Sequence, residues 1–206
     1  MLILLTILGC TPEMPSEAAL ARAPVLAVGG DVQLGRRTNA LVGLSGPADA
    51  FRRLTKLTEA DLSYVNLECV AATVGHYGRD KGESAAYYYR ARPEILDVLH
   101  LAGVDVVGTA NNHSGDYGVE AVEEQSALLD GMGIAHPGTG QNRAAACAPI
   151  FRHADDLVVA FFTVDATEEN YEAGDGWGQC TPDLSDSAAW AAHFKERIPE
   201  ARVQAD

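Results

Sequence analysis

Short apolar runs that end in polar, ligand-type side chains constrain the fold of this chain more than any other feature. The clearest run is Val104–Val107, which gives way to Asn111, Asn112 and His113 within one loop. The run has the length and β-branched composition of a buried strand, and the residues after it are typical of a turn. Ligands of open α/β sheets bind outside the carboxyl ends of the strands. The stretch therefore predicts a ligand site at a strand exit.

Two earlier runs repeat this arrangement. Pro24–Val28 leads to Asp31, and Leu62–Leu67 contains Asn66 and leads to Glu68. Parallel strands bring their carboxyl ends to one edge of a sheet, so we expect these polar groups to meet. Oxygen donors together with an imidazole suit Mn²⁺, Mg²⁺, Zn²⁺ or Fe. Each exit alone is explained equally well by a helix cap or a turn, but three coincident exits favour a shared site.

Helical periodicity between these runs predicts an α/β fold built as a layered sandwich with a parallel sheet. The 206 residues suffice for one such domain. We expect helices at Ala48–Ala60, Pro93–Ala102, Val119–Met132 and Ser187–Arg197, a polar loop at Gln33–Asn39, and a hairpin of Ala148–His153 with a deeply buried Leu157–Val164.

The charge of the chain narrows its partners. A formal net charge of −14 argues against binding nucleic acid, which relies on Lys and Arg to neutralise phosphates. It also argues against electrostatic attraction to an anionic bilayer.

The N-terminus has the features of an export signal. Met1–Gly9 is apolar but shorter than the roughly 20 residues of a membrane span, and Ile7–Cys10 resembles a bacterial lipobox. We expect a signal and lipobox segment at residues 1–10, a linker at 11–23 and a domain at 24–206. A lipid on Cys10 would be the protein's only link to the membrane. The alternative is a misassigned start that leaves an apolar end.

The other cysteines and polar residues leave alternatives open. Cys69, Cys147 and Cys180 form no C-x-x-C pair, so one disulfide with a free thiol and three buried thiols are equally compatible. Asp116 is expected to cap the Val119 helix rather than to bind a ligand. Arg36 suits an anionic substrate group through paired donors, or is an ordinary surface residue.

Several segments, in this order, resemble the CapA-type (PgsA-like) poly-γ-glutamate capsule biosynthesis family. They are Gly30–Arg36, Asn66–Glu68, Ala110–Gly118 and Gly138–Asn142. The resemblance covers Pro24–Val164 well and the remainder more loosely. It implies a relative of the calcineurin-like metallophosphoesterases, with a layered α/β sandwich around a centre of one or two divalent metal ions (Mn, Fe, Zn or Mg).

The resemblance also implies roles for individual residues. Asp31, Glu68 and Asn112 would be metal ligands, and His113 would be the catalytic acid or charge stabiliser. We further expect Asn66, Arg36 and Asn111 to contact the substrate.

Members of the family continue with H-W-G-x-E-like and H-P-H-like segments, and this chain ends at Asp206 without them. We therefore expect a C-terminally truncated chain with an incomplete ligand set and uncertain enzymatic activity. Two functions follow. One is a metallophosphoesterase-like envelope protein that acts with the capsule synthesis machinery on an anionic polymer, poly-γ-glutamate or an exopolysaccharide. The other is a non-catalytic envelope lipoprotein, or an accessory factor for polymer export.

Overall fold

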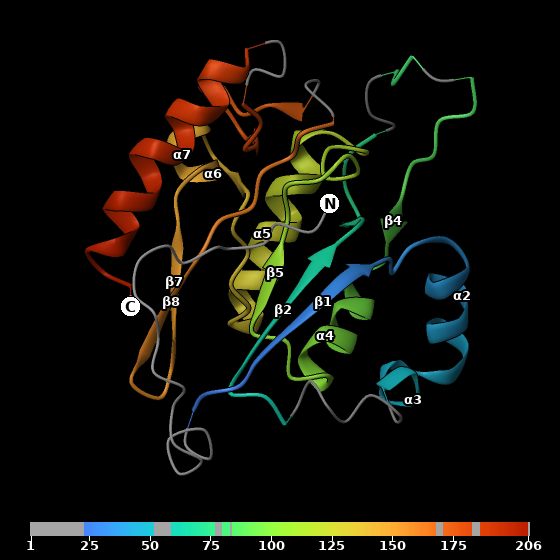
Figure 1. Ribbon diagram of the computed structural model, residues 1–206. Coiled ribbons are helices and arrows are strands. Elements are labelled where there is room, and N and C mark those ends of the chain that lie inside the picture. The colour runs from blue at the N-terminus through green and yellow to red at the C-terminus, as the bar shows by residue number, and fades with distance from the viewer. Residues whose placement is uncertain are drawn as a thin grey trace.

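The central element is a sheet of three parallel strands in the order β1-β2-β5 (Figure 1). The computed structural model describes residues 23–51, 59–76, 80–82, 84–167, 171–182 and 186–205. The strands are β1 (Leu26–Val32), β2 (Leu62–Leu67) and β5 (Val106–Gly108). Each contains or adjoins an apolar run identified in the sequence, and the mixture of helices and strands confirms the α/β class.

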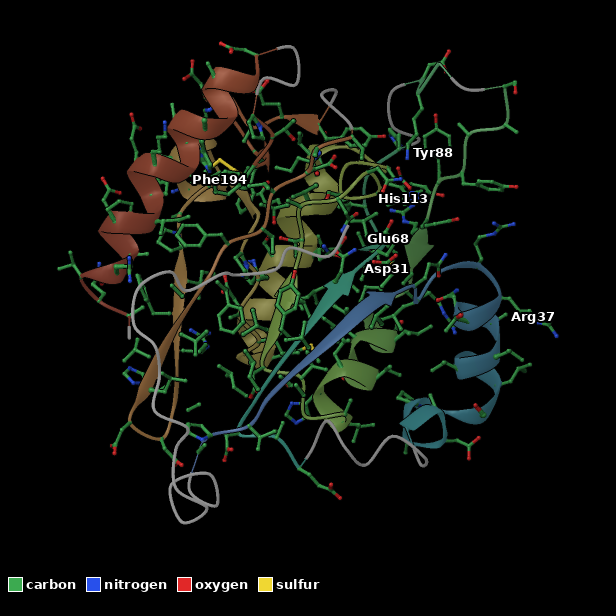
Figure 2. All side chains as sticks on the ribbon, in the orientation of Figure 1. Asp31, Arg37, Glu68, Tyr88, His113 and Phe194 are labelled. Carbon is green, nitrogen blue, oxygen red and sulfur yellow. A yellow bond between two sulfur atoms is a disulfide. The ribbon has the colours of Figure 1, made fainter. Side chains whose placement is uncertain are left out.

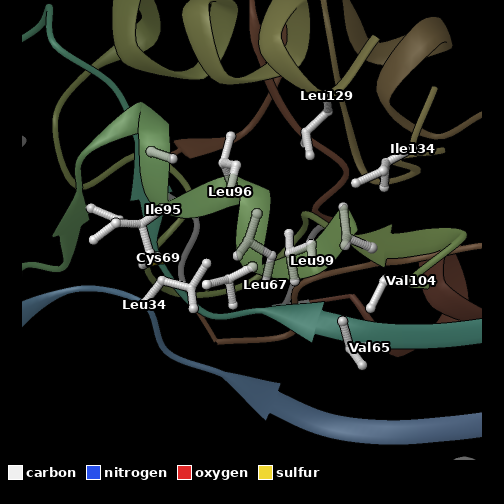
Figure 3. Packing of buried hydrophobic residues seen from close by; sticks show 14 of the residues in the cluster. Leu34, Val65, Leu67, Cys69, Ile95, Leu96, Leu99, Val104, Leu129 and Ile134 are labelled. Carbon is white, nitrogen blue, oxygen red and sulfur yellow. The ribbon is translucent and has the colours of Figure 1, made fainter. Parts of the chain in front are cut away.

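Helices cover one face of this sheet. They are α2 (Arg36–Ser45), the 3₁₀ turn η1 (Pro93–Leu96) that continues into α4 (Asp97–Leu101), and α5 (Val119–Met132). Figure 3 shows their packing, in which Val65 and Leu67 of β2 meet Leu99 and Leu129. All four side chains are at most 2% exposed. Removing a leucine side chain from such a core costs about 2–5 kcal/mol.

An antiparallel hairpin covers the other face. It consists of β7 (Ile150–Ala154) and β8 (Leu157–Phe161). Tyr64 alternates with Val65 along β2 and therefore points to this side, where its ring stacks on Phe161 with centroids 5.8 Å apart. The hairpin confirms the sequence prediction, but most of β8 is only half-buried, so the expected deep burial was wrong.

The first strand differs from the expected core strand. β1 lies at the edge of the three-stranded sheet, and its Leu26 and Val28 are 43% and 67% exposed. Its register with β2 shifts between Val28 and Asp31, which is the signature of a β-bulge. An apolar strand sequence indicates burial but does not tell an edge strand from a central one.

The helical segments agree with the sequence predictions in one case, differ in a second and are described only in part in a third. α5 spans Val119–Met132 as expected and ends at Gly133, whose φ of 72° provides the left-handed cap. The loop expected at Gln33–Asn39 was wrong, because α2 begins at Arg36. Of Ala48–Ala60 the structure describes a helix only within α3 (Pro47–Phe51), and residues 52–58 lie outside the described part.

The helix α7 (Ser187–Arg202) and several short elements complete the fold. Ser187–Arg197 was expected to be helical, and α7 covers that segment and continues to Arg202. The short elements are the parallel pair β3 (Val70–Ala71) and β4 (Arg90–Ala91), the antiparallel pair β6 (Thr139–Gly140) and β9 (Gly178–Gln179), and the helix α6 (Arg143–Ala146).

The cysteines resolve into one disulfide and one thiol. Cys147, at the end of α6, is bonded to Cys180 after β9, and Cys69 is a free, buried thiol. Burial raises the pKa of that thiol to about 12, so Cys69 stays protonated and unreactive. The expected lipobox at residues 1–10 and nearly all of the linker at 11–23 lie outside the described residues.

Candidate metal centre at the strand exits

A carboxamide at the end of β2 joins two carboxylates. The Nδ2 of Asn66 donates to Asp31 Oδ1 at 2.9 Å and to Glu68 Oε2 at 2.5 Å. Asp31 faces Asn66 in the register of β1 and β2, so the parallel pairing itself brings these residues together. Figure 2 shows Asp31 and Glu68 at the upper end of the sheet, close to His113.

The loop after β5 is fastened to the same edge through Asn111. Its Nδ2 donates to Asn66 Oδ1 at 3.1 Å and to the Leu67 carbonyl at 2.9 Å. Its Oδ1 accepts from the His113 backbone N–H at 3.0 Å. Asn111 is 6% exposed, so its carboxamide serves the loop as a three-way connection between β2 and the histidine.

The His113 imidazole is held by the buried carboxylate of Asp116, which was expected to cap the Val119 helix. Its Nδ1 lies 2.7 Å from Asp116 Oδ2, while its Nε2 lies 4.0 Å from Glu68 Oε1. Asp116 is fully buried. The N-cap of α5 is Gly118, which makes no side-chain capping bond. The expectation that Asp116 caps the Val119 helix was therefore wrong. Its carboxylate orients the imidazole and directs Nε2 towards the strand exits.

Asp116 also gathers groups from distant parts of the chain. Lys81 Nζ lies 2.6 Å from Asp116 Oδ1, and the side chains of this pair are 4% and 0% exposed. The ammonium also donates to the Asn112 carbonyl at 2.7 Å. The Tyr89 N–H donates to Asp116 Oδ2 at 2.6 Å, and the Tyr89 ring stacks on His113 with centroids 3.9 Å apart. The imidazole is thus fixed at its edge and on its face.

Burial and the nearby negative charge of Asp31 disfavour ionisation of the Glu68 carboxyl. Its side chain is 16% exposed. Desolvation raises the pKa of this carboxyl, and the charge of Asp31 raises it further, while Asn66 and His113 oppose the shift. Asp165 also raises the pKa of Glu68, so a carboxylate that follows β8 contributes to the electrostatics of the site.

The remaining predicted residues lie at the rim. Asn112 is half-buried, and its carboxamide makes no hydrogen bond with any described residue. Arg36 is exposed at the first turn of α2, where its guanidinium lies over Tyr87 at 4.8 Å from the ring centroid. The structure thus brings Asp31, Asn66, Glu68, Asn111 and His113 together, with Asn112 and Arg36 at their border.

Sequence reasoning missed Lys81 and Asp165. It considered that Tyr87–Tyr89 could line a pocket but favoured packing, and it did not connect Tyr89 with the histidine. Lys81 belongs to a charged stretch without periodicity, which predicts only a surface loop. Its burial depends on Asp116, which lies far away in the sequence. For Asp116 a signal existed, since it follows His113 by three residues in a tight loop.

Another cluster of metal-type side chains, Cys147, Cys180 and His193, has its ligand atoms within 4.8 Å of one another. Both sulfurs are committed to the disulfide, so neither is a thiolate ligand. A cleft lined by Ser114, Tyr171 and Trp177 lies behind the histidine loop. The strand-exit carboxylates do not line it, and it is not the site described above.

The fold and site define an α/β protein with carboxylates, amides and one oriented imidazole at the carboxyl edge of a parallel sheet. The chain matches the family described as "Bacterial capsule synthesis protein PGA_cap" over residues 25–206. It belongs to this family of capsule synthesis proteins, as its motifs indicated.

Two curated relatives are similar to part of the chain. They are the uncharacterized proteins y4sH and y4uA of Sinorhizobium fredii, each 39% identical over 93 residues. The match covers 45% of this chain and 20% of each relative. The matched part of the chain therefore spans about a fifth of the length of these relatives.

Proposed function

We propose that this protein is a metal-dependent, metallophosphoesterase-like component of capsule polymer synthesis, with its reaction centre at the strand exits. The observation that carries the proposal is the convergence of Asp31, Glu68 and His113 on one sheet edge through the carboxamides of Asn66 and Asn111. The metallophosphoesterase-type sandwich is part of the same proposal.

The donor set fits a divalent cation. Asp31 and Glu68 offer carboxylate oxygens and Asn112 offers an uncommitted amide oxygen, which are donors that Mg²⁺, Mn²⁺ and Fe accept. The raised pKa of Glu68 reflects burial and the repulsion from Asp31. A cation between these carboxylates would offset both effects. In this proposal one or two ions are held by Asp31, Glu68 and Asn112.

The chain's own groups have distinct tasks in the proposed reaction. A bound divalent ion supplies Lewis-acid stabilisation of charge on a phosphoryl or carbonyl oxygen. His113, aimed by Asp116, presents Nε2 to the same edge and delivers a proton to a leaving oxygen or stabilises its charge. Asn66 keeps Asp31 and Glu68 at a fixed separation, and Asn111 fixes the loop that carries the imidazole.

The family and the disulfide support a location in the cell envelope. The family is one of capsule synthesis, and the Cys147–Cys180 disulfide is typical of oxidising compartments. Within the described residues, no helix has the length and hydrophobicity needed to cross a bilayer. Anchoring through Cys10 remains part of the proposal, with the capsule synthesis machinery or its anionic polymer as the partner.

A second candidate function is a non-catalytic factor for polymer export. It is favoured by the looseness of the site, since within the described residues the strand-exit groups do not all bring their ligand atoms within 4.8 Å of one another. The nearest approach of His113 Nε2 to Glu68 is 4.0 Å. Such a protein would bind polymer without requiring a metal.

Metal analysis separates the two functions. The protein would be loaded with Mn²⁺, Fe²⁺ or Zn²⁺ and desalted, and its metal content and hydrolysis of bis-p-nitrophenyl phosphate would be measured. We expect Asp31→Asn and Glu68→Gln to lose most of the metal. We expect His113→Asn to retain metal but to lose about 10²–10⁴-fold in rate.

Asp156 provides the matched control, because it is an exposed aspartate in the turn between β7 and β8. Asp156→Asn should leave metal content and rate unchanged. Equal metal content in the wild type, Asp31→Asn and Glu68→Gln would refute the metal centre and leave the export function.

A further inference from the structure

We propose that Arg36 and Tyr87 form a subsite that binds a carboxylate of the polymer chain beside the strand-exit centre. This inference rests on the proposed function for its biological meaning, but its binding test does not depend on a metal. It assigns a substrate chemistry to the rim of the site, namely a carboxylate that lies next to methylene groups of the polymer chain.

Arg36 differs from the neighbouring cationic side chains, because each of those binds another group of the protein. Lys81 is buried against Asp116. Arg90 donates to the Ala72 and Val74 carbonyls, and Arg92 donates to the Asn39 carbonyl. These three positive groups are committed to the protein itself.

The Arg36 guanidinium, in contrast, makes no hydrogen bond or ion pair with any residue that the structure describes. Its Cζ lies over two rings, 4.8 Å from the Tyr87 centroid and 5.9 Å from the Tyr89 centroid. Stacking occupies the face of a guanidinium and leaves the N–H groups at its edge free. Those N–H groups match the two oxygens of a carboxylate.

The stack places this cation next to the proposed reaction centre. Tyr87 and Tyr89 have centroids 6.3 Å apart, and Tyr89 lies on the imidazole of His113. Arg36 also has a φ of 51°, a conformation uncommon for residues other than glycine. Tyr89 is thus the one ring between the Arg36 guanidinium and the His113 imidazole in this stack.

Tyr87 supplies the apolar half of the subsite. It is 55% exposed and presents a ring edge and face against which methylene groups can pack. With a net charge of −14, the protein as a whole repels an anionic chain. Capture of such a chain therefore needs a local cation that is not already neutralised, which is the condition that Arg36 meets.

The test is equilibrium binding of a fluorescent pentamer of γ-linked glutamate to the full chain, in EDTA and again with Mn²⁺. We expect Arg36→Gln to weaken binding about tenfold, because a paired, charge-assisted contact is lost. Arg36→Lys should fall between the two, since it keeps the charge but loses the planar pair of donors. The neutral analogue, a γ-linked pentamer whose α-carboxylates are replaced by α-carboxamides, should bind weakly to every variant.

Arg37 is the matched control. It is the next residue of α2, is also exposed, and lies on the side of the helix away from the strand exits (Figure 2). Arg37→Gln removes the same charge and should leave the affinity unchanged. Circular dichroism of each variant would verify that the fold is retained.

Several results would overturn the subsite. They are equal affinity of the wild type and Arg36→Gln, an equal loss in Arg37→Gln, absence of measurable pentamer binding by the wild type, or better competition by inorganic phosphate than by the pentamer. Two measurements separate the proposals. If Arg36→Gln binds the pentamer more weakly than the wild type, and the wild type holds no metal after loading, the subsite is supported and the metal centre is refuted. Metal content that is normal in Arg36→Gln, with unchanged pentamer affinity, would do the reverse.

Discussion

At the scale of single residues, the most constrained side chain of the site is His113, which is contacted from three directions. Asp116 holds Nδ1, Tyr89 covers the ring, and Asn111 anchors the backbone N–H. The imidazole therefore has little freedom except to present Nε2 to the carboxylates. Such preorganisation suits proton transfer at a fixed position, and it is costly to assemble because a charged pair is buried beneath it.

The buried pair of Lys81 and Asp116 makes a stability prediction. Asp116→Asn leaves an uncompensated ammonium in the interior, which costs about 3–5 kcal/mol of the free energy of unfolding. Replacing Lys81 with Met in the Asp116→Asn background removes that charge and should recover a large part of the loss. Urea unfolding of the wild type, both single variants and the double variant measures the coupling. A loss below about 1 kcal/mol for Asp116→Asn would contradict a buried ion pair.

Glu68 makes a prediction about pH. Its pKa is raised in the folded protein by burial and by Asp31, so the folded state binds this proton more tightly than the unfolded state does. Stability from this group is full below the unfolded pKa and is lost as pH rises through the folded pKa. Glu68→Gln should therefore stabilise the metal-free protein at pH 7 and have less effect at pH 4.

Thermal unfolding in EDTA at the two pH values measures this difference, with about 2–4 °C expected for each kcal/mol recovered. The control is Asp156→Asn, which removes an exposed carboxylate. A midpoint lowered by Glu68→Gln at pH 7 would show that the ionised carboxylate is stabilising instead.

At the scale of elements, the segment from α6 to β9 is closed by a covalent bond. Cys147 and Cys180 are 33 residues apart, and closing a loop of that length stabilises a fold by about 3–4 kcal/mol in the chain-entropy description. The Cys147→Ser/Cys180→Ser variant should lose about this amount in urea unfolding. Cys69→Ala, which removes the buried free thiol, should respond to reductant as the wild type does. An unfolding midpoint of the wild type that is insensitive to dithiothreitol would contradict the bond.

Two glycines, Gly138 and Gly131, should respond in opposite ways to substitution by alanine, because a Cβ has no room at the first and open space at the second. Gly138 has a φ of 116°, and a Cβ there would meet the Ala110 N–H and the Thr163 hydroxyl. Gly138→Ala should destabilise by more than 1 kcal/mol, on the order of a strained backbone position. Gly131 lies within α5 with open space around it, so Gly131→Ala should stabilise by roughly 0.5–1 kcal/mol. Equal effects of both substitutions in urea unfolding would contradict this distinction.

At the scale of the whole molecule, the sequence predicts an element correctly when the residues that determine it lie within that element. The helix at Val119–Met132 was predicted correctly, because its apolar periodicity lies within the segment and its terminating Gly133 follows directly. α2 escaped prediction because Val42 is the one residue of this helix that is buried, so its sequence carries no apolar face with helical periodicity.

The site divides in the same way. Parallel strands explain in advance why Asp31, Asn66 and Glu68 meet, since each lies at or next to a strand end. Lys81 and Tyr89 reach His113 through contacts that arise only when distant segments fold together. The chemical roles of these residues remain predictions.

A cation-specific gain in stability is the last prediction and belongs to the molecule as a whole. With a net charge of −14, any added salt relieves self-repulsion, whereas a specific site adds RT ln(1 + [L]/Kd) on top of screening. Mn²⁺ at one hundred times its Kd should therefore add about 2.7 kcal/mol. In a chain of this size that is about 5–10 °C in the unfolding midpoint. The comparison is NaCl at matched ionic strength, which should give a smaller rise that is equal in the wild type and Asp31→Asn. Only the wild type and variants outside the ligand set, such as Arg37→Gln, should show the additional rise with Mn²⁺. If Asp31→Asn gains as much from Mn²⁺ as the wild type does, the effect is screening by the acidic surface and the strand exits hold no metal.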